Sequence, residues 1–86
     1  MKKYKREVIE GAKEMNTQGK TVMEYLKIFD MVMAHTFDMY KKEQDGPVIP
    51  VFMEYELFEK ARIDTLHLHR QGLLVPFYER LKEGTV

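Results

Sequence analysis

The sequence predicts an all-α fold, a small four-helix domain in which two long antiparallel helices, about 21–43 and 50–71, are flanked by two shorter ones. Three observations lead to this prediction. Apolar residues recur at intervals of three and four along most of the chain. Gly and Pro fall largely between these periodic stretches. The 86 residues, 44% of them hydrophobic and 33% charged, have the length and composition of one globular domain covering 1–86.

The first predicted helix covers about Lys3 to Met15. Gly11 weakens the prediction in its middle, because glycine is a poor helix former. The evidence for the helix is an apolar stripe with spacings of four, four and three residues, formed by Tyr4, Val8, Ala12 and Met15.

The second predicted helix is the expected centre of the fold. Thr21 and Glu24 have the spacing of a capping box, in which each side chain accepts a hydrogen bond from the other residue's backbone amide. The apolar face covers about half of the helix circumference, so it must contact more than one neighbour. Its residues are Val22, Tyr25, Leu26, Ile28, Phe29, Val32, Met33, Phe37, Met39 and Tyr40.

The third predicted helix follows a turn at 44–47 and begins at Pro50, where a missing backbone N–H is tolerated. Gly72 is expected just beyond its last turn. Leu68 and Leu73 would then form the hydrophobic pair of a Schellman ending. Residues 48–57 also alternate between apolar and polar, so the pattern leaves a short strand open as an alternative, although no second strand is available to pair with it.

The fourth predicted helix is short, from Pro76 to Glu83, and Gly84 ends it. Residues 73–75 are expected to form an apolar connector that packs inward. The first and fourth helices are expected to cover the open side of the long pair.

The residue inventory argues against an enzyme. The chain has no Cys and no Ser, which excludes disulfides, thiolate metal sites and the commonest nucleophiles. No cofactor-binding motif is present, and no cofactor is expected. His67 and His69 would point about 200° apart on a helix, so they cannot share a metal ion, and no metal site is predicted. His69 is interpreted as a side chain that favours the dipole at the helix C-terminus.

The charge pattern predicts a cytoplasmic protein without a membrane segment. Fourteen basic residues balance fourteen acidic ones. The uncharged stretches are far too short to span a bilayer, and no apolar segment follows the charged N-terminus as in a signal peptide.

The third helix carries a surplus of apolar residues. Its main stripe comprises Leu57, Phe58, Ala61, Thr65 and Leu68. A second stripe is either an association surface or a face that another helix of the same chain covers. We favour association, because a chain this small has few elements to cover both stripes.

We therefore predict a non-enzymatic protein–protein interaction module, a homodimeric regulator or adaptor acting on a larger protein partner whose identity the sequence does not give. The predicted partner-binding residues are those of the second stripe and an exposed methionine of the second helix: Phe52, Tyr55, Ile63, Leu66 and Met31.

The alternative is a small helix-turn-helix-like DNA-binding transcriptional regulator that uses the turn at Gly72. Its short recognition helix carries Glu79 and Glu83, and the chain lacks the basic excess usual in such proteins. The candidate nucleic-acid-binding residues are Lys2, Lys3, Lys5, Arg6, Arg70, Arg80 and Lys82.

Overall fold

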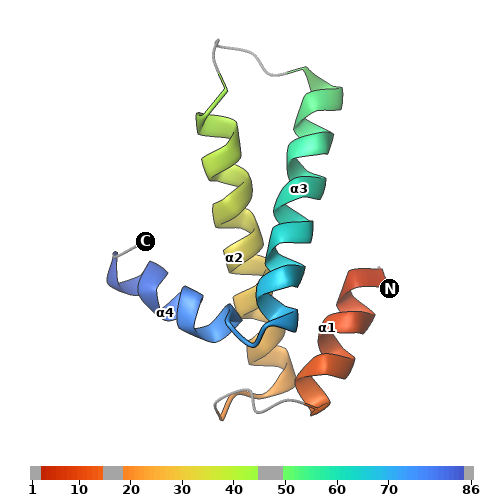
Figure 1. The fold of residues 1–86 in the computed structure, drawn as a ribbon, viewed down its shortest axis with the longest axis vertical. Helices are drawn as coiled ribbons and strands as arrows, with labels where there is room; N and C mark the ends of the chain where they lie inside the picture. Colours follow the sequence, from red (N-terminus) through yellow and green to blue (C-terminus); the bar gives the residue numbers. More distant parts are fainter. Residues whose placement is uncertain (1–2, 15–18, 45–49, 85–86) are drawn as a thin grey trace.

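Two long helices lie side by side and run antiparallel, and a shorter helix packs on each side of the pair (Figure 1). The computed structural model describes residues 3–14, 19–44 and 50–84. Within these ranges the predicted all-α fold with four helices is confirmed. The helices are α1 (Lys3–Glu14), α2 (Val22–Lys42), α3 (Val51–Arg70) and α4 (Leu74–Glu83). The predicted turn residues 45–47 and Met15 lie outside the described residues.

The start of α2 is fixed by the predicted capping box. The hydroxyl of Thr21 accepts a hydrogen bond from the Glu24 amide at 3.1 Å. In return, the Glu24 carboxylate accepts one from the Thr21 amide at 3.4 Å. Two amides that lack partners within the helix are satisfied in this way, so α2 begins at the position the sequence predicts.

The end of α3 is the predicted Schellman turn. Gly72 has a φ of +72°, a conformation that side chains with a Cβ disfavour. The Leu73 amide donates to the Leu68 carbonyl at 2.9 Å, and the Gly72 amide donates to the His69 carbonyl at 3.1 Å. These two bonds define the motif, and they turn the chain from α3 into α4. Gly84, with a φ of +76°, ends α4 as predicted.

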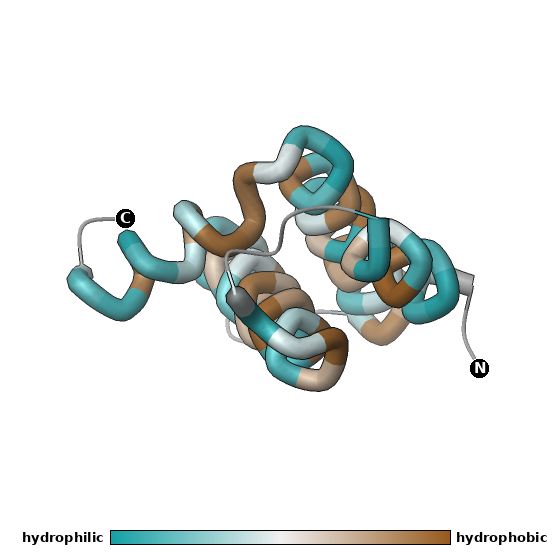
Figure 2. The backbone as a smooth tube through the Cα atoms, turned by 90° about the horizontal axis from the view of Figure 1, so that it is seen from below, coloured by the Kyte–Doolittle hydropathy of each residue, from teal (hydrophilic) through white to brown (hydrophobic). Residues whose placement is uncertain are grey.

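Helix α3 begins at Val51, directly after Pro50 as predicted, whereas α4 begins earlier than predicted. Residues from Val51 onward are helical, so the strand alternative is wrong for them. Helix α4 begins at Leu74, two residues before Pro76. Pro76 still lies in the first turn, where backbone amides have no partner within the helix. Leu74 and Val75 are helical, so they belong to this first turn rather than to a connector. Both are buried as predicted, whereas Leu73 is 47% exposed. Figure 2 looks along the long helices, and residues 73–75, between α3 and the body of α4, are drawn as hydrophobic.

The core is centred on α2, as predicted. Phe29 and Val32 are fully buried in the middle of that helix, and the ring of Tyr4 from α1 stacks on Phe29 with centroids 5.6 Å apart. Leu74 brings α4 into the same core. One prediction for α2 is wrong: Met39, assigned to the apolar face, is 46% exposed.

Candidate interaction surface

The second apolar stripe of α3 is covered by α1 along only part of its length. Helix α1 lies beside the half of α3 that leads to the C-terminal turn (Figure 1). Leu66 is 4% exposed there and belongs to the core. The guanidinium of Arg62 lies over the Tyr4 ring, 5.9 Å from its centroid, near the N-terminal end of α1. Beyond this level no described residue of α1 covers the outer face of α3, and we call that part of α3 uncovered.

The uncovered part of α3 carries large apolar side chains. Val51 is 83% exposed, Phe52 66% and Tyr55 67%. Ile63 is also exposed, nearer to α1. Phe52, Tyr55 and Ile63 therefore lie on the surface, as their predicted role requires, whereas Leu66 does not, because it is buried in the core. Val51 was missed by the sequence analysis. It lies one helical turn before Tyr55, and this spacing of four residues is the signal that could have identified it.

A shallow groove of about 300 Å³ lies beside these side chains, between the end of α2 and the beginning of α3. The rings of Phe37 and Phe58 meet edge to face in its wall, 5.7 Å apart. Lys41 lies over the Phe37 ring and pairs with Glu54 at 3.6 Å. We refer to this as the α2–α3 groove. Its lining residues are Phe37, Val51, Glu54, Tyr55 and Phe58.

Met31 lies in a different place from the other predicted partner-binding residues. It is exposed on α2 and lines a second groove, of about 220 Å³, between α2 and α4. We refer to this as the α2–α4 groove. The two grooves share no lining residue, so the predicted set does not form one continuous site. The lining residues of the second groove are Lys20, Glu24, Lys27, Ile28, Met31, Tyr78 and Lys82.

The predicted nucleic-acid-binding residues are not gathered on one face. Helices α1 and α4 lie on opposite sides of the long pair (Figure 1), so Lys5 and Arg6 are separated from Arg80 and Lys82. Lys2 and the side chain of Lys3 lie outside the described part of the structure.

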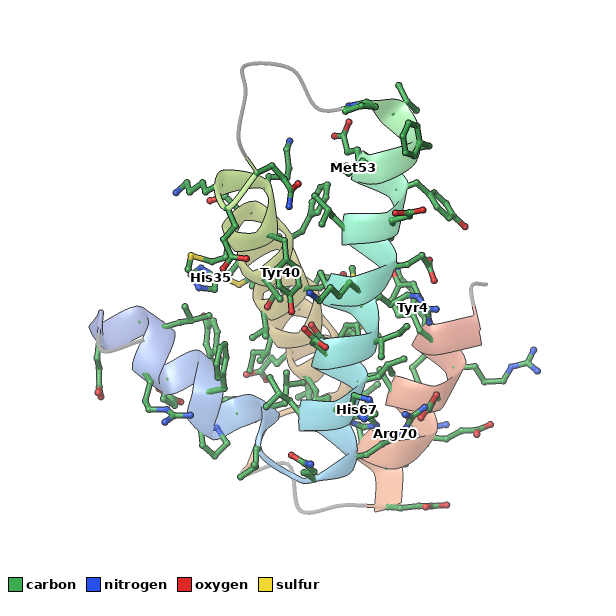
Figure 3. The ribbon with its side chains drawn as sticks, turned by 45° about the horizontal axis from the view of Figure 1, so that its top comes forward. Tyr4, His35, Tyr40, Met53, His67 and Arg70 are labelled. Atoms are coloured by element: carbon green, nitrogen blue, oxygen red, sulfur yellow. The ribbon has the colours of Figure 1, made fainter. Side chains whose placement is uncertain are left out.

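Arg70 is engaged with a carboxylate of α1. Its Nε donates to Glu7 at 2.6 Å, and Figure 3 shows Arg70 near the lower end of α3, beside α1. This hydrogen bond lowers the pKa of Glu7 and raises the pKa of Arg70. Lys82 lies 3.8 Å from Glu79, while Arg80 lies over the Phe77 ring at 5.8 Å.

His69 is a structural residue at the meeting point of three helices. It is almost fully buried, and its Nδ1 lies 3.0 Å from the Tyr25 hydroxyl of α2. The backbone of Glu7 in α1 hydrogen-bonds to the same ring. Burial is the largest influence on the pKa of His69 and lowers it. His69 lies in the last turn of α3, as the helix-dipole interpretation requires, but burial disfavours the charged form that would interact with the dipole. His67, by contrast, is exposed.

A second polar contact joins α2 to α3 nearer the groove at their ends. The Tyr40 hydroxyl donates a hydrogen bond to Asp64, and the ammonium of Lys60 lies over the Tyr40 ring, 4.3 Å from its centroid (Figure 3). The hydrogen bond to Asp64 is the main cause that raises the pKa of Tyr40 to about 12. This contact binds the two long helices together next to the uncovered stripe.

Searches for other kinds of site gave no positive finding. Over residues 3–14, 19–44 and 50–84, no three His, Cys, Asp or Glu side chains are arranged to hold a metal ion. No helix in this part of the chain has both the length and the apolar character needed to cross a bilayer. No family model, curated protein or solved structure matches the chain.

Proposed function

We propose that this protein is a non-enzymatic interaction module that forms a homodimer through one end of its long helix pair. The surface involved, which we refer to as the hairpin surface, consists of Val51, Phe52 and Tyr55 together with the α2–α3 groove beside them. The observation that carries the proposal is the exposure of these three neighbouring apolar side chains, each 66% exposed or more. Contiguous exposed apolar surface on a small protein is typical of an association site.

The energetics favour a symmetric arrangement. Burying one large apolar side chain stabilises an assembly by roughly 1.5–3 kcal/mol. In a twofold dimer every such contact is made twice, because the same patch is used by both copies. An exposed ring, Phe52, lies next to a groove with aromatic walls. The ring of one copy can therefore enter the groove of the other, and the reverse contact forms at the same time.

We further infer that this homodimer is a cytoplasmic regulator or adaptor that binds a larger protein partner. The absence of cysteine is in keeping with a reducing compartment.

The self-association is tested by light scattering over a concentration series from low to high micromolar. We expect the mass to rise towards twice that of one chain as concentration increases. Met23→Ser should show the same rise in mass, because Met23 is also about two-thirds exposed but lies outside both grooves. A mass of one chain at every concentration would rule out the homodimer.

The second candidate function is DNA binding. The observation in its favour is the Schellman turn at Gly72, which joins two helices through a short connection as a helix-turn-helix does. The separation of the basic residues onto opposite sides of the long pair weighs against it. Titration of a DNA duplex at two salt concentrations tests this function. Binding that weakens steeply with salt would support it, and no binding would exclude it.

A further inference from the structure

The α2–α4 groove combines an apolar floor with a basic rim. We call its apolar lining residues the floor: Ile28, Met31 and Tyr78. We call its three lysines the rim, and they come from both sides of the groove and from the residue before the α2 cap: Lys27, Lys82 and Lys20. The one acidic residue of the lining is Glu24, whose carboxylate already accepts a hydrogen bond from the Thr21 amide.

The two sides of the groove repeat the same arrangement. On α2, Lys27 and Met31 are four residues apart and therefore neighbours on one helix face. On α4, Tyr78 and Lys82 have the same spacing, and the Lys82 ammonium lies 5.3 Å from the centroid of the Tyr78 ring. Each helix thus places one large apolar or aromatic side chain beside one lysine. A ligand that enters between α2 and α4 meets both kinds of group from both sides.

The lysine of α4 is held only weakly by its own neighbours. Lys82 lies 3.8 Å from Glu79, and both side chains are about half exposed. Exposed ion pairs of this kind contribute little, because water and salt screen them. Lys82 can therefore exchange this contact for a carboxylate of a ligand at little cost.

We propose that the α2–α4 groove binds an acidic segment of a protein partner, with an apolar side chain of that segment resting on Met31 and Tyr78. The groove lining carries three lysines against one glutamate, and with Glu79 beside Lys82 the charge around the groove is still net positive, which is complementary to glutamate or aspartate. The apolar floor gives no favourable contact to a phosphate backbone, which argues for a peptide over a nucleic acid. This inference rests on the proposed function only in identifying the larger partner's chemistry, since the groove shares no residue with the hairpin surface.

The methionines provide the test, because labelled methyl groups report binding by NMR at known positions. The probe is a synthetic amphipathic peptide of Leu and Glu, and its counterpart replaces each Glu with Lys. We expect the Glu peptide to shift the Met31 methyl signal and to leave that of Met39 in place, since Met39 is exposed on α2 two turns beyond Met31 and outside the groove. The Lys peptide should leave both signals in place. Raising the salt concentration should weaken the binding of the Glu peptide.

Charge-reversal variants make the test specific to the groove. Lys27→Glu should weaken binding of the Glu peptide roughly tenfold, which corresponds to about 1.4 kcal/mol. Lys13→Glu is the matched control, since it makes the same change in net charge at an exposed position of α1. It should leave the affinity within roughly twofold of the original.

Several outcomes would overturn the proposal. These are an unmoved Met31 signal, equal binding of the two peptides, or equal loss of affinity in the two variants. Tighter binding of a DNA oligonucleotide than of the Glu peptide at the Met31 signal would assign the groove to nucleic acid instead. The result is separable from self-association: a monomer that binds the Glu peptide overturns only the homodimer, and a dimer that does not bind it overturns only the assignment of the groove.

Discussion

A Cβ atom placed on Gly11 would lie 2.5 Å from Nε2 of His69, closer than two such atoms can approach. Gly11 is therefore the point at which α1 comes close to α3, and the buried imidazole occupies the space that a side chain would need. The glycine that weakens the sequence prediction of α1 is what allows the helix to pack there. This close contact helps to hold α1 over the lower part of α3 and leaves the beginning of α3 uncovered.

Gly11→Ala is predicted to destabilise the protein. In an exposed helix the same change stabilises by about 1 kcal/mol. Here the methyl group meets the His69 ring, and relieving such overpacking costs about 1–3 kcal/mol. We expect a lower urea midpoint than in the wild type. An increase in stability would show that α1 does not pack this closely. Gly11→Ala should cost less when it is made in the His69→Ala variant than in the wild type, since the clashing ring is removed.

Gly72→Ala serves as a comparison with a different physical cause. Nothing lies within 4 Å of a Cβ at Gly72, so the substitution meets no steric obstacle. Its cost comes from the positive φ alone and is expected to be about 1–2 kcal/mol. Gly72→Asn should lose less than Gly72→Ala, because asparagine tolerates this conformation better. Equal losses for the two variants in urea denaturation would contradict the Schellman assignment.

The buried imidazole of His69 predicts a stability that depends on pH. Its pKa in the folded protein is lowered below 6.5 by burial, and Arg70 also lowers it, while the Glu7 carboxylate and backbone oppose these effects. Tyr25 is the remaining polar contact. Between the two pKa values the unfolded chain binds a proton that the folded protein does not. The free energy of unfolding should therefore decrease as pH falls from 6.5 towards the pKa of the folded state.

The measurement for His69 is urea denaturation between pH 7.5 and pH 5, in the same buffer and salt. His69→Gln should lose some stability at all pH values but show a smaller decrease towards pH 5. His67→Gln is the control, because it removes an exposed imidazole two residues away. It should keep the pH dependence of the wild type. An identical pH dependence in wild type and His69→Gln would show that His69 is not the group responsible.

The hydrogen bond between Tyr40 and Asp64 predicts a tyrosine that ionises late. The pKa of Tyr40 is raised to about 12, mainly by this hydrogen bond. The stability that the hydrogen bond between Tyr40 and Asp64 contributes should be complete below pH 10. It should be lost as pH rises from 10 towards 12, because the tyrosine then loses its proton. Asp64→Asn should lower the pKa of Tyr40, as measured from the carbon next to the hydroxyl by NMR. Asp38→Asn, which removes a carboxylate paired with Lys42, should not, and equal effects of the two variants would refute the assignment.

Much of the fold could be predicted because its helix ends depend on local chemistry. At these ends, backbone amides or carbonyls find hydrogen-bond partners within a few residues, so the sequence alone is informative there. The residues concerned are Thr21 with Glu24, Gly72 with its flanking leucines, and Gly84. The apolar spacings similarly identified the buried faces of α1 and α2. These features are independent of how far one helix extends along another.

The remainder depended on tertiary geometry. No periodicity indicates that α1 ends partway along α3, so Leu66 was grouped with Phe52 although only Leu66 is buried. The exposure of Met39 could not be predicted for the same reason, since it depends on which neighbouring helix reaches that part of α2. The contact between Gly11 and His69 joins residues far apart in the chain, and neither residue alone signals it. The candidate surface was therefore predicted in part, with Phe52 and Tyr55 placed correctly on the exterior.

The central claim is that the uncovered apolar end of α3 holds two copies of this chain together. Sedimentation equilibrium of the wild type beside Phe52→Ser tests it most directly, with Met23→Ser as the control for loss of an exposed apolar side chain. The account predicts a dimer for the wild type and for Met23→Ser. For Phe52→Ser it predicts a dissociation constant raised at least roughly tenfold, because the lost contact is made twice across a twofold interface. A wild type that sediments as one chain, or three proteins with the same dissociation constant, would contradict it.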